Sequence, residues 1–388
     1  MNIEIKIDKL VYGGEGLGFI DGKACFVEGA LPGEKVLARI TSSKKNFCKS
    51  KLLEVLEASP HRLTPPCPYI GQCGGCQYQH LTYAEELRWK ENQVRESFVQ
   101  ALKLDPALIE PLPFSPREYG YRQSVTLHKI SPGSAKERLA YIGRDNRSTV
   151  AVDRCLLADE RLQGVFASEH SLAPHEKDRT FKLSENGRVF TSGNPEEYRV
   201  KIGESSLLTN SRCFFQNNPA VTKFAADKIA GWVAQTKPER FADLYAGVGT
   251  FSLLCARAVP SIFCFEENPH GLECLRKNFA EQKLPLGKAA EGPVEKTFPA
   301  FARENRGEKT FLFLDPPRRG IEPGVAKLLA NANAGETIAY LACDLAILIR
   351  DLRIILSGGA YEIQAVIPFD MFPRTKHIEV AALLKLKG

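Results

Sequence analysis

The chain lacks the long apolar segments found in exported and membrane-spanning proteins. Its first residues, MNIEIKIDKL, alternate polar and apolar side chains and contain no apolar stretch of a signal peptide. No run of 18 apolar residues occurs in the 388 residues, which argues against a membrane span. Internal repeats are also absent from the sequence. These absences predict a globular, cytoplasmic protein with reduced thiols, and we expect a monomer without an obligate protein partner.

Short segments separated by glycines make up residues 1–59, at the spacing of a small β-barrel of the OB type. Four lysines fall in its last loop and strand, namely Lys44, Lys45, Lys49 and Lys51. The whole chain carries 52 lysines and arginines against 46 acidic residues, a net charge of +6. This charge suits RNA or another polyanion as a partner. A purely structural barrel with a solvated lysine face fits the same pattern equally well.

Cysteine is concentrated just after this first module. The run CPYIGQCGGCQ contains Cys67, Cys73 and Cys76, and it follows a proline-rich boundary. Three close thiols in a chain without an export signal predict a metal or iron–sulfur site, and both kinds of site usually need a fourth ligand. The best candidate for that ligand is Cys155. Zinc is the alternative metal, although four-cysteine zinc sites more often show two close pairs.

The rest of the chain divides into two regions with different patterns. Residues 60–210 contain a predicted helix over 82–103, which we expect to pack on the following region, and then mostly strands. Over residues 211–388, predicted strands and helices alternate, which is typical of a doubly wound, mostly parallel α/β sheet. Such sheets bind their ligands beyond the carboxyl ends of the strands.

A turn with two glycines indicates a ligand site in the third region. The segment DLYAGVGTF places Gly247 and Gly249 between a strand and a helix, where free N–H groups can face a ligand. Ser252 stands where a dinucleotide motif would have its third glycine, which argues against NAD. Glu266 ends the next strand and could bind two ribose hydroxyls. This combination fits the adenosine half of S-adenosylmethionine; the alternative is an ordinary turn and a surface acid.

Three reactive side chains lie at the ends of other predicted strands. Asp315 lies in FLFLDPPRRG, where two prolines fix the turn, and Cys343 ends the neighbouring strand. Glu379 opens the last strand. A thiolate that adds to carbon 6 of a uracil makes carbon 5 able to accept a methyl group, and a carboxylate must then remove the carbon 5 hydrogen. Taken singly, Cys343 and Glu379 would be read as a core thiol and a surface acid.

Together, these motifs resemble the S-adenosylmethionine-dependent RNA uracil-5-methyltransferases, most closely the bacterial class that acts on 23S ribosomal RNA. The resemblance covers nearly the whole chain. It implies an N-terminal TRAM barrel, a β-rich central domain with a [4Fe–4S] cluster, and a Rossmann-like catalytic domain. The implied cluster ligands are Cys67, Cys73, Cys76 and Cys155. The implied contacts to the methyl donor are Gln216 in RCFFQNNPA, Tyr245, Glu266 and Asp315. The implied nucleophile and base are Cys343 and Glu379.

The sequence departs from this family next to the nucleophile. The family usually reads SCNP there, whereas this chain reads ACDL over residues 342–345. A negative charge on Asp344 would raise the pKa of the neighbouring thiol unless a cation compensates. Three cations could do so, namely Arg318, Arg350 and Lys376.

Other functions compete with methylation of 23S rRNA. A tRNA target is the nearest alternative, although the tRNA-directed bacterial branch of the resembled family typically lacks both the barrel and the cluster. A catalytically weakened iron–sulfur RNA-binding protein is a second alternative, supported only by the altered residues 342–345. A Rossmann oxidoreductase is disfavoured by the missing third glycine.

Overall fold

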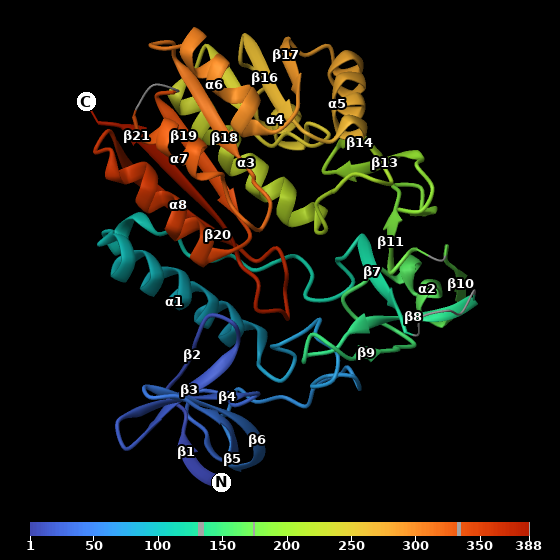
Figure 1. The fold of residues 1–388 in the computed structure, drawn as a ribbon, viewed down its shortest axis with the longest axis vertical. Helices are drawn as coiled ribbons and strands as arrows, with labels where there is room; N and C mark the ends of the chain where they lie inside the picture. Colours follow the sequence, from blue (N-terminus) through green and yellow to red (C-terminus); the bar gives the residue numbers. More distant parts are fainter. Residues whose placement is uncertain (131–135, 174, 332–334, 388) are drawn as a thin grey trace.

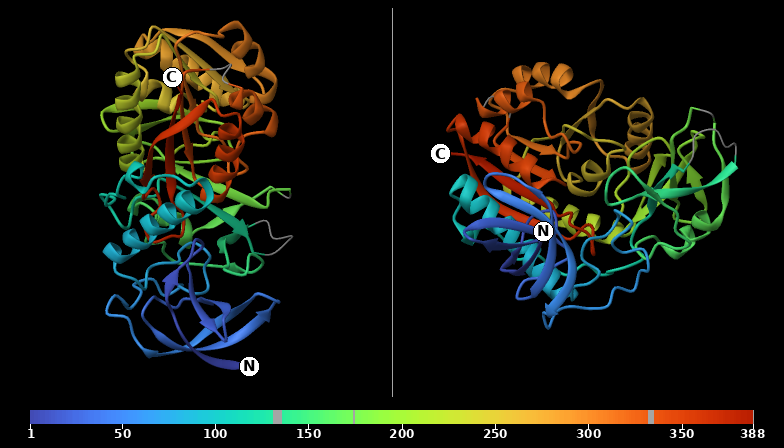
Figure 2. Two further views of the ribbon diagram at one scale, coloured as in Figure 1. Left: turned by 90° about the vertical axis from the view of Figure 1, so that its left-hand side faces the viewer. Right: turned by 60° about the horizontal axis from the view of Figure 1, so that its bottom comes forward.

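The computed structural model of the chain describes residues 1–130, 136–173, 175–331 and 335–387 (Figure 1). The molecule is elongated, with the N-terminal strands at one end and the large C-terminal sheet at the other, and Figure 2 shows the same order from two further directions. No helix in the described ranges has the length and apolar character needed to cross a membrane.

The N-terminal module is a curved, six-stranded sheet with the order β1-β5-β6-β4-β3-β2. Its strands are β1 (Asn2–Lys6), β2 (Lys9–Leu10), β3 (Glu15–Ile20), β4 (Lys23–Glu28), β5 (Lys35–Ser43) and β6 (Phe47–Glu57). In β1, Ile3 and Ile5 alternate with exposed polar residues, because successive side chains of a strand point to opposite faces. The inward-facing residues form a small core of their own with Val27, Val36 and Cys25.

The long helix α1 (Tyr83–Leu102) joins this module to the C-terminal sheet. Its residues Val94 and Phe98 are fully buried in the same core as the sheet, and the helix packs against α8 (Leu345–Ser357). The helix ends at Lys103, whose φ of 56° is left-handed and whose N–H bonds back to the last turn. The cysteine-rich segment, residues 67–76, lies between β6 and this helix.

The central region is built mainly of short antiparallel strands. The larger of its sheets has the order β10-β8-β7-β11-β12, with β9 beside β8, and β13 and β14 form a separate hairpin. Its strands are β7 (Ser124–Lys129), β8 (Lys136–Ile142), β9 (Thr149–Val150), β10 (Glu169–Ser171), β11 (Asp178–Leu183), β12 (Val189–Thr191), β13 (Glu197–Ile202) and β14 (Ser205–Asn210). Short helical turns complete it: η1 (Pro106–Leu108), η2 (Glu160–Leu162) and α2 (Gly164–Ala167).

The C-terminal region is a seven-stranded sheet with the order β17-β16-β15-β18-β19-β21-β20. The strands are β15 (Arg240–Asp243), β16 (Ser261–Glu266), β17 (Leu286–Glu291), β18 (Thr310–Leu314), β19 (Thr337–Ala342), β20 (Tyr361–Phe369) and β21 (Glu379–Leu386). The first five of these pair in parallel, and β21 runs antiparallel to both of its neighbours.

Helices cover both faces of this sheet. One face packs against α1 and α8, together with α6 (Val294–Glu304) and α7 (Pro323–Ala330). The other face packs against α3 (Pro219–Thr236), α4 (Thr250–Cys255) and α5 (Pro269–Gln282). Because both faces are covered, β18 and β19 are buried along their whole length and consist almost entirely of apolar residues. The doubly wound, mixed α/β architecture predicted from the alternating pattern is therefore present.

Candidate active site and cysteine site

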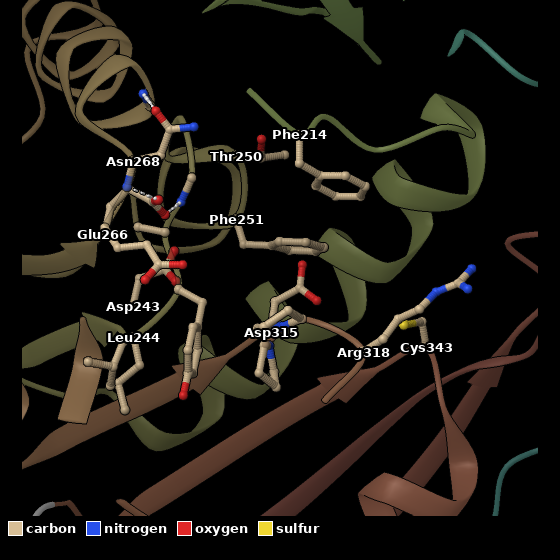
Figure 3. A pocket seen from close by; sticks show the side chains of 18 of the residues that line it. Phe214, Asp243, Leu244, Thr250, Phe251, Glu266, Asn268, Asp315, Arg318 and Cys343 are labelled. Atoms are coloured by element: carbon tan, nitrogen blue, oxygen red, sulfur yellow. Dashed lines mark hydrogen bonds between the residues drawn. The ribbon is translucent and has the colours of Figure 1, made fainter. Parts of the chain in front are cut away.

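A cavity of about 540 Å³ lies beyond the carboxyl ends of the parallel strands, which we call the strand-end cavity. Side chains that follow β15, β16, β18 and β19 line it, together with the first residue of β21. In Figure 3, Glu266 and Asn268 lie at one end, Cys343 and Arg318 lie at the other, and Asp315 is between them. All six residues that we predicted from the sequence for donor binding and catalysis line this one cavity: Gln216, Tyr245, Glu266, Asp315, Cys343 and Glu379.

The Glu266 end of the cavity is organised by backbone N–H groups. One carboxylate oxygen of Glu266 accepts from the N–H of Gly247 at 2.7 Å, and the other accepts from the N–H of Asn268 at 2.7 Å. Gly247 has a φ of 55° and Gly249 one of 86°, which glycine adopts without a steric penalty. The two bonds fix the carboxylate and leave a free lone pair on each oxygen for a ligand. Burial raises the pKa of Glu266.

Asp243 is a residue of this site that we did not predict. It ends β15 and is almost fully buried, and one of its oxygens accepts from the Ser252 hydroxyl at 2.6 Å. The other oxygen has no hydrogen-bond partner. Burial raises the pKa of Asp243 to about 7. Its position directly after a strand, like that of Asp315, was the available signal in the sequence.

Acidic groups dominate the Cys343 end of the cavity. The Gln216 side chain donates to a carboxylate oxygen of Asp315 at 3.0 Å. Burial raises the pKa of Glu379 to about 7 and, together with Glu379, raises that of Asp315 well above its usual value. Burial also raises the pKa of Cys343 to about 12, and both acids add to this shift. The guanidinium of Arg318 opposes the shifts of Cys343 and Glu379.

The unusual residue Asp344 has a structural role next to Cys343. Its side chain caps α8 by accepting from the backbone N–H groups of Ala346 at 3.0 Å and Ile347 at 3.1 Å. The largest charge effects on the Cys343 thiol come from Glu379 and Asp315 rather than from this neighbour. Leu345 takes the position where the resembled family has proline, and its N–H donates to the Tyr12 hydroxyl of the N-terminal module at 3.4 Å.

Of the three cations proposed to compensate this charge, Arg318 has the largest effect on the thiol. Its guanidinium lowers the pKa of Cys343, and Figure 3 shows the two side chains next to each other. The guanidinium of Arg350 is instead bound to the carboxylate of Asp351 and to the backbone oxygen of Arg319. The positive charge near Cys343 is therefore that of Arg318, which lies after β18 and three residues beyond Asp315.

The four cysteines of the predicted metal site come together although they are far apart in sequence. Cys67, Cys73, Cys76 and Cys155 line one cavity of about 30 Å³, the cysteine cavity. All four thiols are free. In the ranges that the structure describes, no group of three or more His, Cys, Asp or Glu side chains is arranged tightly enough to hold a metal ion. The cavity therefore brings the right ligands to one place without forming a closed metal cage.

Polar groups around the cysteine cavity suit an anionic group held by thiolates. The Gln79 amide donates to the sulfur of Cys76 at 3.1 Å, and the N–H of Gly75 donates to that of Cys73 at 3.4 Å. Arg122 also lines the cavity, and its Nε is buried without a hydrogen-bond partner. Burial raises the pKa of the Cys76 thiol to about 12. A positive charge and two donors would favour the thiolates that metal binding requires.

Comparison with known protein families assigns both ends of the chain. Residues 2–53 match the TRAM domain, within the barrel predicted over residues 1–59. Residues 305–387 match the tRNA (uracil-5-)-methyltransferase family, and this range contains Asp315, Cys343 and Glu379.

Relatives extend the match over the whole chain. An uncharacterized RNA methyltransferase of Bdellovibrio bacteriovorus is 32% identical and aligns over 99% of this chain and 95% of its own length. Another, from Halalkalibacterium halodurans, is 28% identical over 100% of this chain and 97% of its own length. The chain therefore belongs to the RNA methyltransferases, and its matched domains identify the branch as the uracil-5 family, which uses S-adenosylmethionine.

A solved structure confirms the fold at low sequence identity. The tRNA (uracil-54, C5)-methyltransferase of Pyrococcus abyssi, in complex with S-adenosyl-L-homocysteine, superimposes with a TM-score of 0.73. It is 20% identical and covers 98% of this chain and 100% of its own. The predicted TRAM barrel and the Rossmann-like α/β domain are thus confirmed, and the family match confirms the resemblance at the level of the uracil-5-methyltransferases.

Proposed function

We propose that this protein methylates carbon 5 of a uridine in RNA, 23S rRNA in preference to tRNA, through a covalent bond between Cys343 and the uracil. The observation that carries the proposal is the shared cavity of Cys343, Glu379 and Asp315, which come from the ends of three different strands. A lone buried thiol would be unremarkable, but a thiol that faces two carboxyl groups in a ligand-sized cavity is typical of covalent catalysis.

S-adenosylmethionine would occupy the end of the cavity near Glu266 and supply the methyl group. The fixed carboxylate of Glu266 would accept from the two ribose hydroxyls. We assign the remaining donor contacts to Gln216, Tyr245 and Asp315, which line the path from Glu266 to Cys343. The hydrogen bond between Gln216 and Asp315 keeps these two side chains in a fixed relation.

The reaction needs Cys343 as a thiolate and Glu379 as a carboxylate. The thiolate adds to carbon 6 of the uracil, and the resulting enolate attacks the methyl group from carbon 5. Glu379 then takes the hydrogen from carbon 5, and the electron pair of that bond expels the thiolate from carbon 6. Arg318 favours the thiolate, because a positive charge lowers the pKa of a nearby thiol. The positive charge on the sulfur of S-adenosylmethionine would likewise lower the pKa values of Cys343, Glu379 and Asp315.

An exposed aromatic ring at the mouth of the cavity supports an RNA substrate. Phe214 lines the cavity, and its side chain is 74% exposed. A base has to leave its stack to reach Cys343, and an aromatic face can stabilise the unstacked base. The lysines of the TRAM barrel would bind phosphates, so affinity should fall as the salt concentration rises.

The choice of rRNA over tRNA depends on the domain composition. A TRAM barrel and a four-cysteine site resemble the class that acts on 23S rRNA. A tRNA substrate is the second candidate, since the structural neighbour from Pyrococcus abyssi is a tRNA methyltransferase of the same overall fold.

For the cysteine cavity we propose a [4Fe–4S] cluster bound by Cys67, Cys73, Cys76 and Cys155. Support comes from the four converging thiols and the buried guanidinium of Arg122, whose charge would partly balance four thiolates. Such a cluster would hold the cysteine-rich segment against the central region. Zinc is the alternative occupant.

A methyl-transfer assay tests the proposed function. Purified protein is incubated with S-adenosylmethionine labelled in its methyl group and with either 23S rRNA or bulk tRNA that lacks 5-methyluridine. We expect label in 5-methyluridine of the rRNA, and none with Cys343→Ala. Label in tRNA alone would move the substrate to the second candidate. If wild type and Cys343→Ala transfer equally, or neither transfers, the assignment of Cys343 fails and an RNA-binding role without catalysis takes its place.

A further inference from the structure

The segment between β20 and β21, residues 370–378, forms a strap that leads directly into Glu379. It is not a surface loop, since Asp370, Met371, Thr375 and Ile378 are almost completely buried. Two of its aromatic rings, those of Phe372 and His377, lie 5.9 Å apart and form part of the wall of the strand-end cavity. The position of the strap therefore determines where the carboxylate of Glu379 points.

Side chains from three separate segments hold successive carbonyl groups of the strap. The Asn218 amide donates to the backbone oxygen of Met371 at 3.2 Å. Lys90 of α1 donates to that of Phe372 at 3.3 Å. The hydroxyl of Tyr121 donates to that of Pro373 at 3.0 Å. Buried carbonyl groups require such partners, so this part of the strap has one defined path.

The next residue, Arg374, connects the strap to the cysteine-rich segment. Its φ of 67° is left-handed, and its backbone oxygen accepts from the N–H groups of both Gln77 and Tyr78 at 3.1 Å. Its own N–H donates to the carboxylate of Glu86 at 2.8 Å. A non-glycine residue holds this conformation only where its surroundings fix it, which these bonds do.

The side chain of Gln77 adds a second link to the same two segments. Its amide oxygen accepts from the N–H of Lys376 at 3.0 Å, and its amide nitrogen donates to the backbone oxygen of Gly74 at 2.9 Å. Gln77 is buried, and it directly follows Cys76. One amide thus holds the strap three residues before Glu379 and, at its other end, the cysteine-rich segment.

We propose that Gln77 is a positioning residue for the base, because it fixes the strap before Glu379 and makes the geometry of that carboxylate depend on the fold of the cysteine-rich segment. This inference rests on the proposed function, in which Glu379 removes the carbon 5 hydrogen. Without the Gln77 amide, the N–H of Lys376 loses its buried partner and the end of the strap can shift. The addition of Cys343 and the methyl transfer do not involve Glu379 as a base. Breakdown of the covalent adduct does require Glu379 as a base, because the carbon 5 hydrogen has to be removed before the thiolate can leave.

The test compares Gln77→Met with Gln93→Met. Methionine keeps the length of the side chain and removes the amide. Gln93 is a second buried glutamine, whose amide bonds to the N-terminal module and to Tyr78 and does not touch the strap. Each protein is mixed with S-adenosylmethionine and substrate RNA, and the covalent protein–RNA adduct is measured on a denaturing gel. S-adenosylmethionine binding is measured in parallel.

We expect Gln77→Met to accumulate methylated adduct and to lose about tenfold to a hundredfold in turnover, because a misplaced catalytic group has an effect of this size. The affinity of Gln77→Met for S-adenosylmethionine should equal that of wild type. The adduct level of Gln93→Met should also equal that of wild type. Gln77→Glu, which retains an acceptor for the Lys376 N–H but loses the donor to the Gly74 oxygen, should recover part of the turnover. If Gln77→Met does not fold, Gln77→Asn replaces it in the test, because its side chain is one methylene shorter and moves the amide away from the strap.

Glu379→Gln separates the two possible failures. If it accumulates adduct while Gln77→Met resembles Gln93→Met, the positioning role of Gln77 is wrong. If Glu379→Gln forms no adduct and wild type transfers no methyl group, the proposed function itself is wrong.

Discussion

At the scale of single residues, the strand-end cavity shows which positions could be predicted. Glu266, Asp315 and Cys343 each follow a predicted strand, and parallel strands bring such residues to one edge. Glu379 was proposed from its place at the start of the last predicted strand and from the need for a carboxylate base, and the resemblance implies the same role. Asp243 was missed, although it is the last residue of β15 and lies at the same edge of the sheet as Asp315, which directly follows β18. The role of Gln77 was out of reach, because its contacts span 299 positions of sequence.

The pKa of Glu379 gives a prediction at this scale. Burial raises it to about 7, so the carboxyl group is protonated at lower pH and cannot accept the carbon 5 hydrogen. Turnover should therefore fall as the pH decreases below about 7. Removing the charge in Arg318→Ala should move this decrease to higher pH, since the guanidinium favours the ionised carboxylate. The measurement is the rate of methyl transfer against pH. A rate that stays level from about pH 8 to about pH 5 would exclude Glu379 as the base.

At the scale of elements, long periodic segments were predicted well and irregular ones were not. Helix α1 runs over Tyr83–Leu102, where the pattern predicts 82–103. Strand β17 was missed because Gly287 and Lys288 interrupt its apolar pattern at the edge of the sheet. Helix α6, which follows β17, has Pro299 in its interior. Because proline is unfavourable inside a helix, the helical spacing of Phe298 and Phe301 did not indicate a helix here.

Helix α1 carries a buried charge network that supports a second prediction. The ammonium of Lys90 is fully buried and lies 2.8 Å from the carboxylate of Glu86 and 2.7 Å from that of Asp370. Lys90→Met should destabilise the protein by about 3–5 kcal/mol, because it leaves the buried Asp370 without a cationic partner and leaves Glu86 with Arg374 alone. Arg88→Ala, which removes the exposed partner of the Arg88–Glu85 pair on the same helix, should cost less than about 1 kcal/mol. Urea denaturation measures both values. Equal effects would contradict the importance of the buried network.

At the scale of the whole molecule, the structure places Cys343 and the four cysteines of the predicted metal site in two different cavities. The cysteine cavity and the strand-end cavity have no cysteine in common, and they are connected through the strap. Long-range contacts of this kind are not visible in local periodicity. The connection between the two cavities is visible only in the structure. The sequence itself singles out Cys155 as the candidate fourth ligand, and the structure places it in the same cavity as the triplet.

This separation predicts opposite results for two cysteine variants. Protein purified without oxygen should show the brown absorbance of an iron–sulfur cluster. Cys155→Ser should lose this absorbance and much of the thermal stability, because one ligand of four is missing. Cys343→Ala should keep both and lose turnover. Wild-type protein that contains zinc and no iron would contradict the cluster, and an absorbance loss in Cys343→Ala would contradict the separation of the two sites.

The most direct test of the whole account is a trapped reaction with RNA in which uridine is replaced by 5-fluorouridine. Cys343 can add to carbon 6 and the methyl group can be transferred, but fluorine cannot leave as a proton, so Glu379 has nothing to remove. The account predicts a stable protein–RNA adduct whose mass after digestion corresponds to one methylated fluorouridine nucleotide on the peptide that contains Cys343. No adduct with the wild-type protein, or an adduct on any other residue, would contradict it.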